Sequence, residues 1–125
     1  MKVLVLKDGM FIEKEIDNTL KALQKEVDGY IEIPFLSEKL NERRIDIIIN
    51  EEGKFIDGLK IEIAIVHQGR IVDLVFGNIV FASNDDEDNT IGLTEEQIDF
   101  IKQELKREMI IKYGERIEIV RVLKI

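Results

Sequence analysis

The residue types that most often carry out chemistry are scarce in this chain of 125 residues. It has no cysteine and one histidine, His67. Without cysteine there is no thiolate nucleophile, no disulfide and no zinc–sulfur site. One histidine cannot form a histidine acid–base pair or a multi-histidine metal site, and a lone histidine near a strand end is more often structural. We therefore expect no catalytic residues, no metal and no cofactor, and we predict a protein that binds and does not catalyse.

The acidic run at residues 84–89 suggests a calcium loop at first sight. With Asp86 as its first ligand, an EF-hand loop needs glycine at the sixth position and glutamate at the twelfth. The chain has Ile91 and Gln97 at those positions. We therefore interpret the run as a solvated loop that precedes a helix, and leave open whether it has a function. No glycine run has the spacing of a phosphate-binding loop.

Basic side chains gather in the last part of the chain, although the formal net charge is −8. They are Lys102, Lys106, Arg107, Lys112, Arg116, Arg121 and Lys124. The common explanation is that basic residues near the C-terminus of a helix complement its dipole. The alternative is a local anion site, because arginine pairs with phosphate through two hydrogen bonds. Both interpretations stay open at this point.

One aromatic residue and three asparagines precede this basic segment: Phe81, Asn78, Asn84 and Asn89. Asn78 follows Gly77 between two apolar segments and most simply supplies turn geometry. Its alternative role is to contact a bound base.

The acidic balance argues against direct binding to nucleic acid, because phosphate contacts usually require a basic surface. An acidic surface can instead bind a basic protein or imitate DNA toward one. It also serves solubility, which is its usual role. No apolar run approaches the ~20 residues of a membrane span. Charge interrupts Met1–Asp8 too early for a signal peptide, so we expect a cytoplasmic protein with no membrane partner.

Turn and periodicity signals predict a single α+β domain over residues 1–125, with a mostly antiparallel sheet and two helices. Asp8-Gly9 is a strong two-residue hairpin turn between two predicted strands. A first helix, over about 18–28, follows three candidate N-caps and ends just before Gly29. Strands are predicted at 1–7, 11–16, 30–33, 45–50, 71–76 and 79–82.

A second helix is predicted over about 95–112, because its first residues complete a capping box with Thr94. The stretch 59–67 alternates as a strand does, although a short helix also fits. The polar stretch 37–44 is predicted to be a loop. Residues 116–125 are predicted to form a terminal strand with an exposed edge, and a homo-oligomer is the simplest way to cover that edge.

Three sequence blocks carry a resemblance to a known family: Leu20-x-x-Leu-Gln24-x-x-Val27-Asp-Gly-Tyr30-Ile-Glu32, Asn50-Glu-Glu-Gly-Lys54 and Leu93-Thr-Glu-Glu-Gln-Ile98. Their order and spacing resemble a family of small bacterial, plasmid and phage proteins described as a domain of unknown function. The resemblance covers roughly Lys2 to Ile111. The chain departs from the pattern at Asp28, where the family prefers glycine, and at 61–65. The tail beyond Ile111 looks additional, and its role stays open.

More loosely, the size and layout resemble phage sponge proteins of the Thoeris anti-defence type. That resemblance implies a ligand-binding set of Phe81, Asn84, Asn89, Lys106 and Arg107, to which we add Asn78. The Phe81 ring would stack on adenine, the asparagines would contact polar edges, and Lys106 and Arg107 would neutralise a pyrophosphate. Our leading hypothesis is thus sequestration of a small anionic nucleotide immune signal, either cyclic ADP-ribose-like or a cyclic oligonucleotide. The alternative is an acidic interaction module, or DNA mimic, that inhibits a host DNA-binding or restriction protein.

Overall fold

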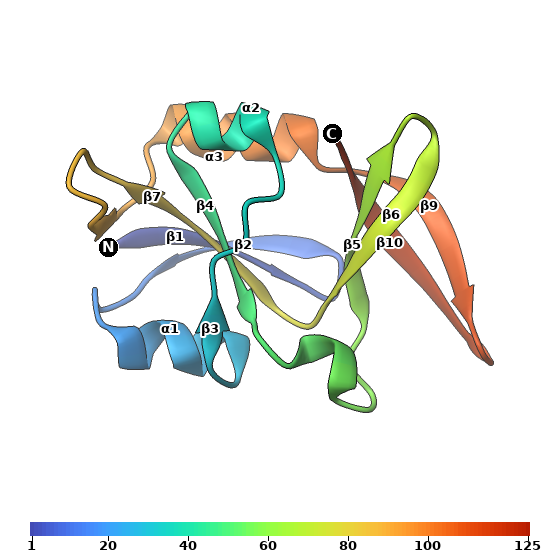
Figure 1. The fold of residues 1–125 in the computed structure, drawn as a ribbon. Helices are drawn as coiled ribbons and strands as arrows, with labels where there is room; N and C mark the ends of the chain where they lie inside the picture. The colour runs from blue at the N-terminus through green and yellow to red at the C-terminus, as the bar shows by residue number, and fades with distance from the viewer.

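The fold consists of two β-sheets that pack against each other, with helices on both faces of the first (Figure 1). The computed structural model describes residues 1–125, apart from the side chain of Tyr113. The first sheet runs β2 (Met10–Glu15), β1 (Lys2–Lys7), β7 (Ile79–Asn84), β4 (Ile45–Asn50) and β3 (Ile31–Glu32), with β8 (Thr90–Ile91) beside β7. The second runs β6 (Arg70–Phe76), β5 (Ile61–His67), β10 (Arg116–Lys124) and β9 (Lys106–Tyr113). Only β5 and β10 pair in parallel, which confirms the predicted α+β class with mostly antiparallel strands.

The helices are α1 (Leu20–Val27), α2 (Glu38–Glu42) and α3 (Glu95–Glu104), with a 3₁₀ turn, η1, at Gly53–Phe55. Helix α1 covers one face of the first sheet, where its Leu23 and Val27 pack against apolar residues of β1, β4 and β7. The opposite face packs against α2, α3 and the inner face of the second sheet. The first sheet is therefore a central layer that is buried on both sides.

Local signals predicted the ends of several elements correctly. Asp8 and Gly9 have φ values of 51° and 76°, as a two-residue type I′ hairpin turn requires. The Thr19 hydroxyl accepts a hydrogen bond from the Ala22 amide at the start of α1. The predicted capping box of α3 is present in both directions. One detail differs, since Asp28, with φ of 62°, takes the left-handed position after α1.

The second predicted helix is too long. Helix α3 ends at Glu104, and the residues from Lys106 onward, expected to be helical to 112, form strand β9 instead. The physical reason is a non-local partner, because β9 pairs along its length with β10. Such pairing overrides a local helical pattern, particularly for the β-branched Ile110 and Ile111.

Two further predictions need correction, and one open question is settled. The stretch 37–44, predicted to be a loop, contains α2, which Ser37 caps through the Leu40 amide. The stretch 59–67 contains strand β5 and no helix. Residues 116–124 do form a strand, and β10 pairs with β9 along most of its length but with β5 only at Arg121–Lys124. The last residues of β10 are therefore not an exposed edge, which weakens the argument from that edge to a homo-oligomer, and the homo-oligomer stays a prediction.

The turn between β1 and β2 is fixed to the second sheet by a buried polar contact. The Glu62 carboxylate, 3% exposed, accepts hydrogen bonds from the amides of Gly9 (2.8 Å) and Asp8 (3.1 Å). Burial raises the pKa of Glu62 above its ordinary value, and the two amide bonds only partly oppose this. On the other side of the turn, Arg121 donates to the Gly9 carbonyl from Nε (3.1 Å) and Nη2 (3.0 Å).

Arg121 makes two further contacts. Its Nη1 donates to the Leu105 carbonyl (2.7 Å), which follows the end of α3. Its guanidinium carbon lies 4.1 Å from the centre of the Phe11 ring, and Phe11 meets Phe81 edge-on. Arg107 also donates to the Gly9 carbonyl, from Nη2 (2.8 Å) and Nε (3.1 Å). One guanidinium therefore joins β10, α3 and the first hairpin.

We predict that Arg121→Met lowers the free energy of unfolding by about 2–3 kcal/mol, because the carbonyl of buried Leu105 loses its charged donor, the Gly9 carbonyl keeps only Arg107, and Phe11 loses its cation. Urea denaturation followed by circular dichroism measures this. Arg70→Met is the matched control, since Arg70 is exposed at the far end of β6, and should change stability by less than about 0.5 kcal/mol. Equal effects of the two substitutions would contradict the role given to Arg121.

Candidate functional site

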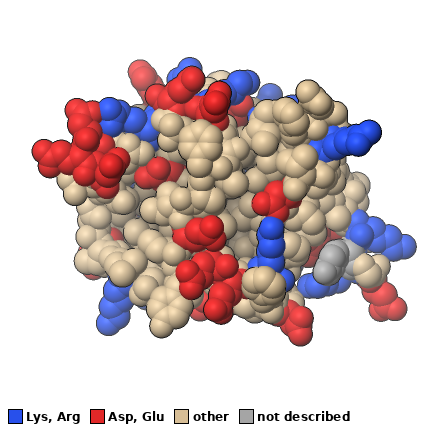
Figure 2. All heavy atoms as spheres, viewed as in Figure 1, with Lys and Arg blue, Asp and Glu red and all other residues tan. Residues whose placement is uncertain are grey.

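The six predicted ligand-binding residues do not come together in one place. Phe81 and Asn84 lie on β7, Asn78 precedes that strand, and Asn89 precedes β8; Lys106 and Arg107 lie on β9 of the other sheet. Charge is likewise spread out: on the face in Figure 2, acidic and basic side chains are mixed, with an acidic group at the upper left.

Phe81 cannot stack on a ligand as predicted. Its ring is 0% exposed and belongs to the main core, because β7 is a central strand with both faces covered. The Asn84 amide donates to the Asp46 carboxylate (3.1 Å). Arg107 is occupied with the Gly9 carbonyl, as described above. Lys106 is exposed on β9, away from the asparagines.

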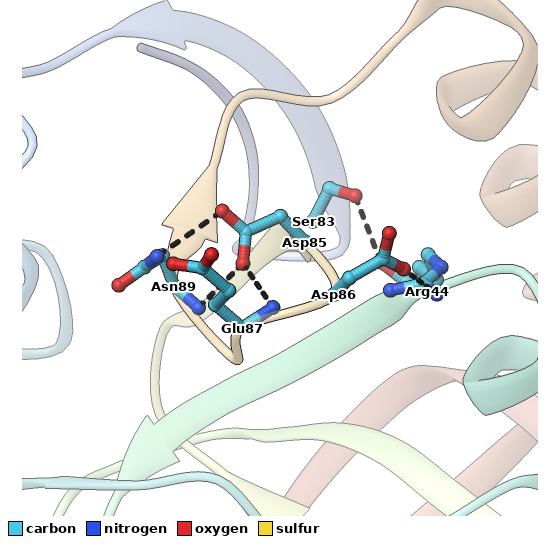
Figure 3. Close-up of polar contacts among 6 residues, drawn as sticks. All are labelled: Arg44, Ser83, Asp85, Asp86, Glu87 and Asn89. Atoms are coloured by element: carbon cyan, nitrogen blue, oxygen red, sulfur yellow. Dashed lines mark hydrogen bonds and ion pairs between the residues drawn. The ribbon is translucent and has the colours of Figure 1, made fainter.

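In the acidic loop, the Asp85 carboxylate accepts hydrogen bonds from other residues of the same loop (Figure 3). Asp85 Oδ1 accepts from the amides of Glu87 and Asn89, both at 2.9 Å, and Oδ2 accepts from the Asn89 side chain at 3.2 Å. These bonds, led by the Asn89 amide, lower the pKa of Asp85. Asp86 pairs with Arg44 across the loop. Among the described residues, no group of three or more histidine, cysteine, aspartate or glutamate side chains is arranged to hold a metal ion.

His67 has a structural contact. It ends β5 and is exposed, and its Nδ1 lies 2.9 Å from the Ile125 carbonyl, to which it must donate. The ring thereby ties the residue after β10 to the end of β5, next to the backbone bond from the Ile125 amide to the Val66 carbonyl. This contact gives His67 a structural role.

A groove ringed by lysines is one of the hollows on the surface that could hold a ligand. It has a volume of about 310 Å³ and lies between β1, β2, the end of α1 and the turn before β7. We call it the lysine groove; its lining residues are Val5, Lys7, Ile12, Lys14, Lys25, Glu26 and Asn78. Asn78 is the member of the predicted set that reaches it.

The hairpin register explains why two of these lysines share one face, at opposite ends of the Val5–Ile12 pair. Val5 and Ile12 lie directly opposite each other in the β1–β2 pair, so their side chains share a face. Lys7 and Lys14 lie two residues further along their strands and therefore share that face as well. Ile12, which is 43% exposed, leaves an open apolar floor between the lysines.

Two hydrogen-bonded contacts define the wall of the lysine groove near α1. Lys14 Nζ lies 2.8 Å and 2.9 Å from the two carboxylate oxygens of Glu26. The Asn78 side-chain amide donates to the Glu26 carbonyl at 3.3 Å. Lys25, in the last turn of α1, borders the same space. Three lysines thus face one glutamate, and Lys7 and Lys25 are exposed to solvent.

Two of the blocks that carry the family resemblance meet around Asn50. This side chain is 5% exposed, and its Nδ2 donates to the carbonyls of Val27 and Asp28, both at 3.2 Å. Its Oδ1 accepts from the Glu52 amide at 2.8 Å. A Cβ at Gly29 would lie 2.6 Å from Asn50 Nδ2, so the close approach requires glycine there. These two sequence blocks therefore contain the residues that join the end of α1 to the end of β4, and we call this contact the joint.

We predict that Asn50→Asp lowers the free energy of unfolding by about 3 kcal/mol, because a carboxylate would replace the amide donor against two carbonyl oxygens. Asn41→Asp adds the same charge at an exposed position of α2 and should have an effect below about 0.5 kcal/mol. Thermal unfolding of the two variants provides the comparison. A stable Asn50→Asp protein would show that the joint is not needed.

No helix among the described residues is long and apolar enough to cross a bilayer. No curated protein and no solved structure matches the chain. A family model described as "Domain of unknown function (DUF3846)" matches residues 1–106, which span everything up to the first residue of β9. The resemblance to a family of unknown function is thereby confirmed, while the resemblance to Thoeris sponges stays a prediction. The chain belongs to the DUF3846 family.

Proposed function

We propose that the protein is a non-catalytic binding protein that holds a small anionic ligand of the nucleotide class in the lysine groove. The observation that carries this proposal is that Lys7, Lys14 and Lys25 all border one groove with an open apolar floor. Such an arrangement is unexpected in a chain whose net charge of −8 repels anions overall.

Size and chemistry both suit a nucleotide. The volume of about 310 Å³ falls at the lower end of the range of about 300–1,000 Å³ for small-molecule sites. A base or ribose can lie on Ile12, and lysine ammonium groups bind phosphate as point charges. The hydrogen bond from the Asn78 side-chain amide to the Glu26 backbone carbonyl is long, at 3.3 Å. The side-chain carbonyl oxygen and amide of Asn78 can therefore turn to contact a polar edge of the base.

The role we propose for this binding is sequestration of a nucleotide immune signal, which needs affinity and no catalytic group. This role derives from the resemblance to sponge proteins. The lysine groove is lined by one chain, so the proposal does not depend on the expected homo-oligomer. The mixed charges on the face in Figure 2 give the alternative of a DNA mimic less support, because a mimic would spread acid along one face.

We predict that calorimetry detects binding of cyclic ADP-ribose or of a cyclic dinucleotide. The double variant Lys7→Glu/Lys25→Glu should weaken this binding at least about tenfold per lysine, because each change replaces attraction to phosphate with repulsion. Lys102→Glu is the control, since it makes the same charge change on the exposed side of α3.

Three outcomes would overturn parts of this proposal. If calorimetry detects no heat of binding with any of the nucleotides, the protein does not bind this class of ligand. Binding that survives in the double variant removes the lysine groove as the site. The ligand should also be recovered intact, by mass spectrometry, after the protein is denatured, and recovery of a cleaved product would establish an enzyme.

A further inference from the structure

Three aromatic side chains are strongly exposed on neighbouring segments. Tyr30 is 68% exposed, Phe35 66% and Phe55 86%. Tyr30 and Phe35 lie just before and just after β3, and Phe55 ends η1. The Tyr30 carbonyl accepts from the Glu51 amide at 3.0 Å, which brings the two segments side by side. Exposed aromatic groups of this size mark interaction surfaces, where they supply much of the binding energy.

A second hollow, which we call the aromatic cleft, opens beside these residues. It has a volume of about 170 Å³ and lies between β3 with the segment that follows it, η1, and β6. Its lining includes Glu32, Leu36, Glu51, Phe55, Asp73 and Phe76. Gly53 lets η1 pack on β6, because a Cβ there would lie 2.9 Å from the Phe76 carbonyl oxygen. Strands β3 and β6 are each the last strand of their sheet.

The lining of the aromatic cleft carries more negative than positive charge. Glu32, Glu51 and Asp73 face one lysine, Lys54, whose Nζ lies 2.5 Å from Asp73 Oδ1. Burial tends to raise the pKa of Asp73, but the bonds from Lys54 and from the Leu74 amide outweigh it and lower that pKa. Asp73 is therefore ionised at neutral pH and neutralises Lys54, so that Glu32 and Glu51 set the charge presented to a ligand.

We propose that the aromatic cleft receives a lysine or arginine side chain from an extended segment of a partner protein. The volume suits one long side chain and is below the range of about 300–1,000 Å³ usual for nucleotide-sized ligands. The charge is complementary to a cation, and Phe55 supplies an exposed aromatic ring beside it. The flanking edge strands present backbone groups to which an extended chain adds naturally. This site is separate from the lysine groove and independent of its ligand.

The test is an amide NMR titration of the full chain with two synthetic probes, acetyl-Val-Arg-Val-Arg-Val-amide and its Glu-for-Arg counterpart, at up to millimolar concentration. We expect the arginine peptide to shift the resonances of residues 31–36, 51–55 and 73–76, and the glutamate peptide to shift none of them. No shifts in these segments with the arginine peptide would overturn the proposal. Shifts of equal size in the acidic loop 85–88 would also overturn it, because they would indicate unspecific attraction.

Substitutions separate the aromatic and charged contributions. Phe55→Ser should weaken binding of the arginine peptide about tenfold, as expected for an aromatic anchor. Met10→Ser, which also removes an exposed apolar side chain, should leave that binding unchanged. Glu51→Gln should weaken binding of the arginine peptide severalfold, whereas Glu87→Gln, which makes the same change of charge in the acidic loop, should leave binding unchanged. Equal losses within either pair would overturn the assignment to the aromatic cleft. All four positions are exposed, so folding should be unaffected.

Discussion

The contact on which the rest of the structure depends is the capture of one hairpin turn between a buried carboxylate and a guanidinium. Glu62 accepts both amides of the Asp8-Gly9 turn, and Arg121 binds the carbonyl of the same turn. Each of these charges would be costly to bury alone, and each is satisfied only when the two sheets are in place. The arrangement therefore favours one relative position of the sheets over sliding alternatives that an apolar contact alone would tolerate.

The two candidate sites lie in different parts of this framework. The lysine groove lies on the face of the β1–β2 hairpin, and its rim includes Asn78, in the turn where the chain passes from the second sheet to the first. The aromatic cleft opens between outer strands of the two sheets, β3 and β6. One hollow is bordered by lysines and the other by carboxylates and aromatic rings. A domain of this size can in this way present two surfaces of opposite character.

Features that depend on neighbours in sequence could be predicted, and those that depend on distant partners could not. The Asp8-Gly9 turn, the Thr94 capping box and the start of α1 are encoded within a few residues. The end of α3 was misplaced because β9 is specified by its pairing with β10. We wrongly predicted that Phe81 contacts a ligand, because its burial depends on the order of the strands in the sheet, which local sequence does not reveal. The lysine groove needed the β1–β2 register, although the spacing of Lys7 and Lys14 about a known turn was a usable signal.

Strand order also has a consequence for how the chain is made. Strand β10 is the parallel neighbour of β5, yet it follows β5 in the sequence by way of β6, β7, β8, α3 and β9. During synthesis, β5 and β6 can form their hairpin early, but the inner edge of β5 must wait until β10 has left the ribosome. Until then the nascent chain presents an apolar strand with unpaired backbone groups, which is the kind of surface that chaperones bind and that aggregates.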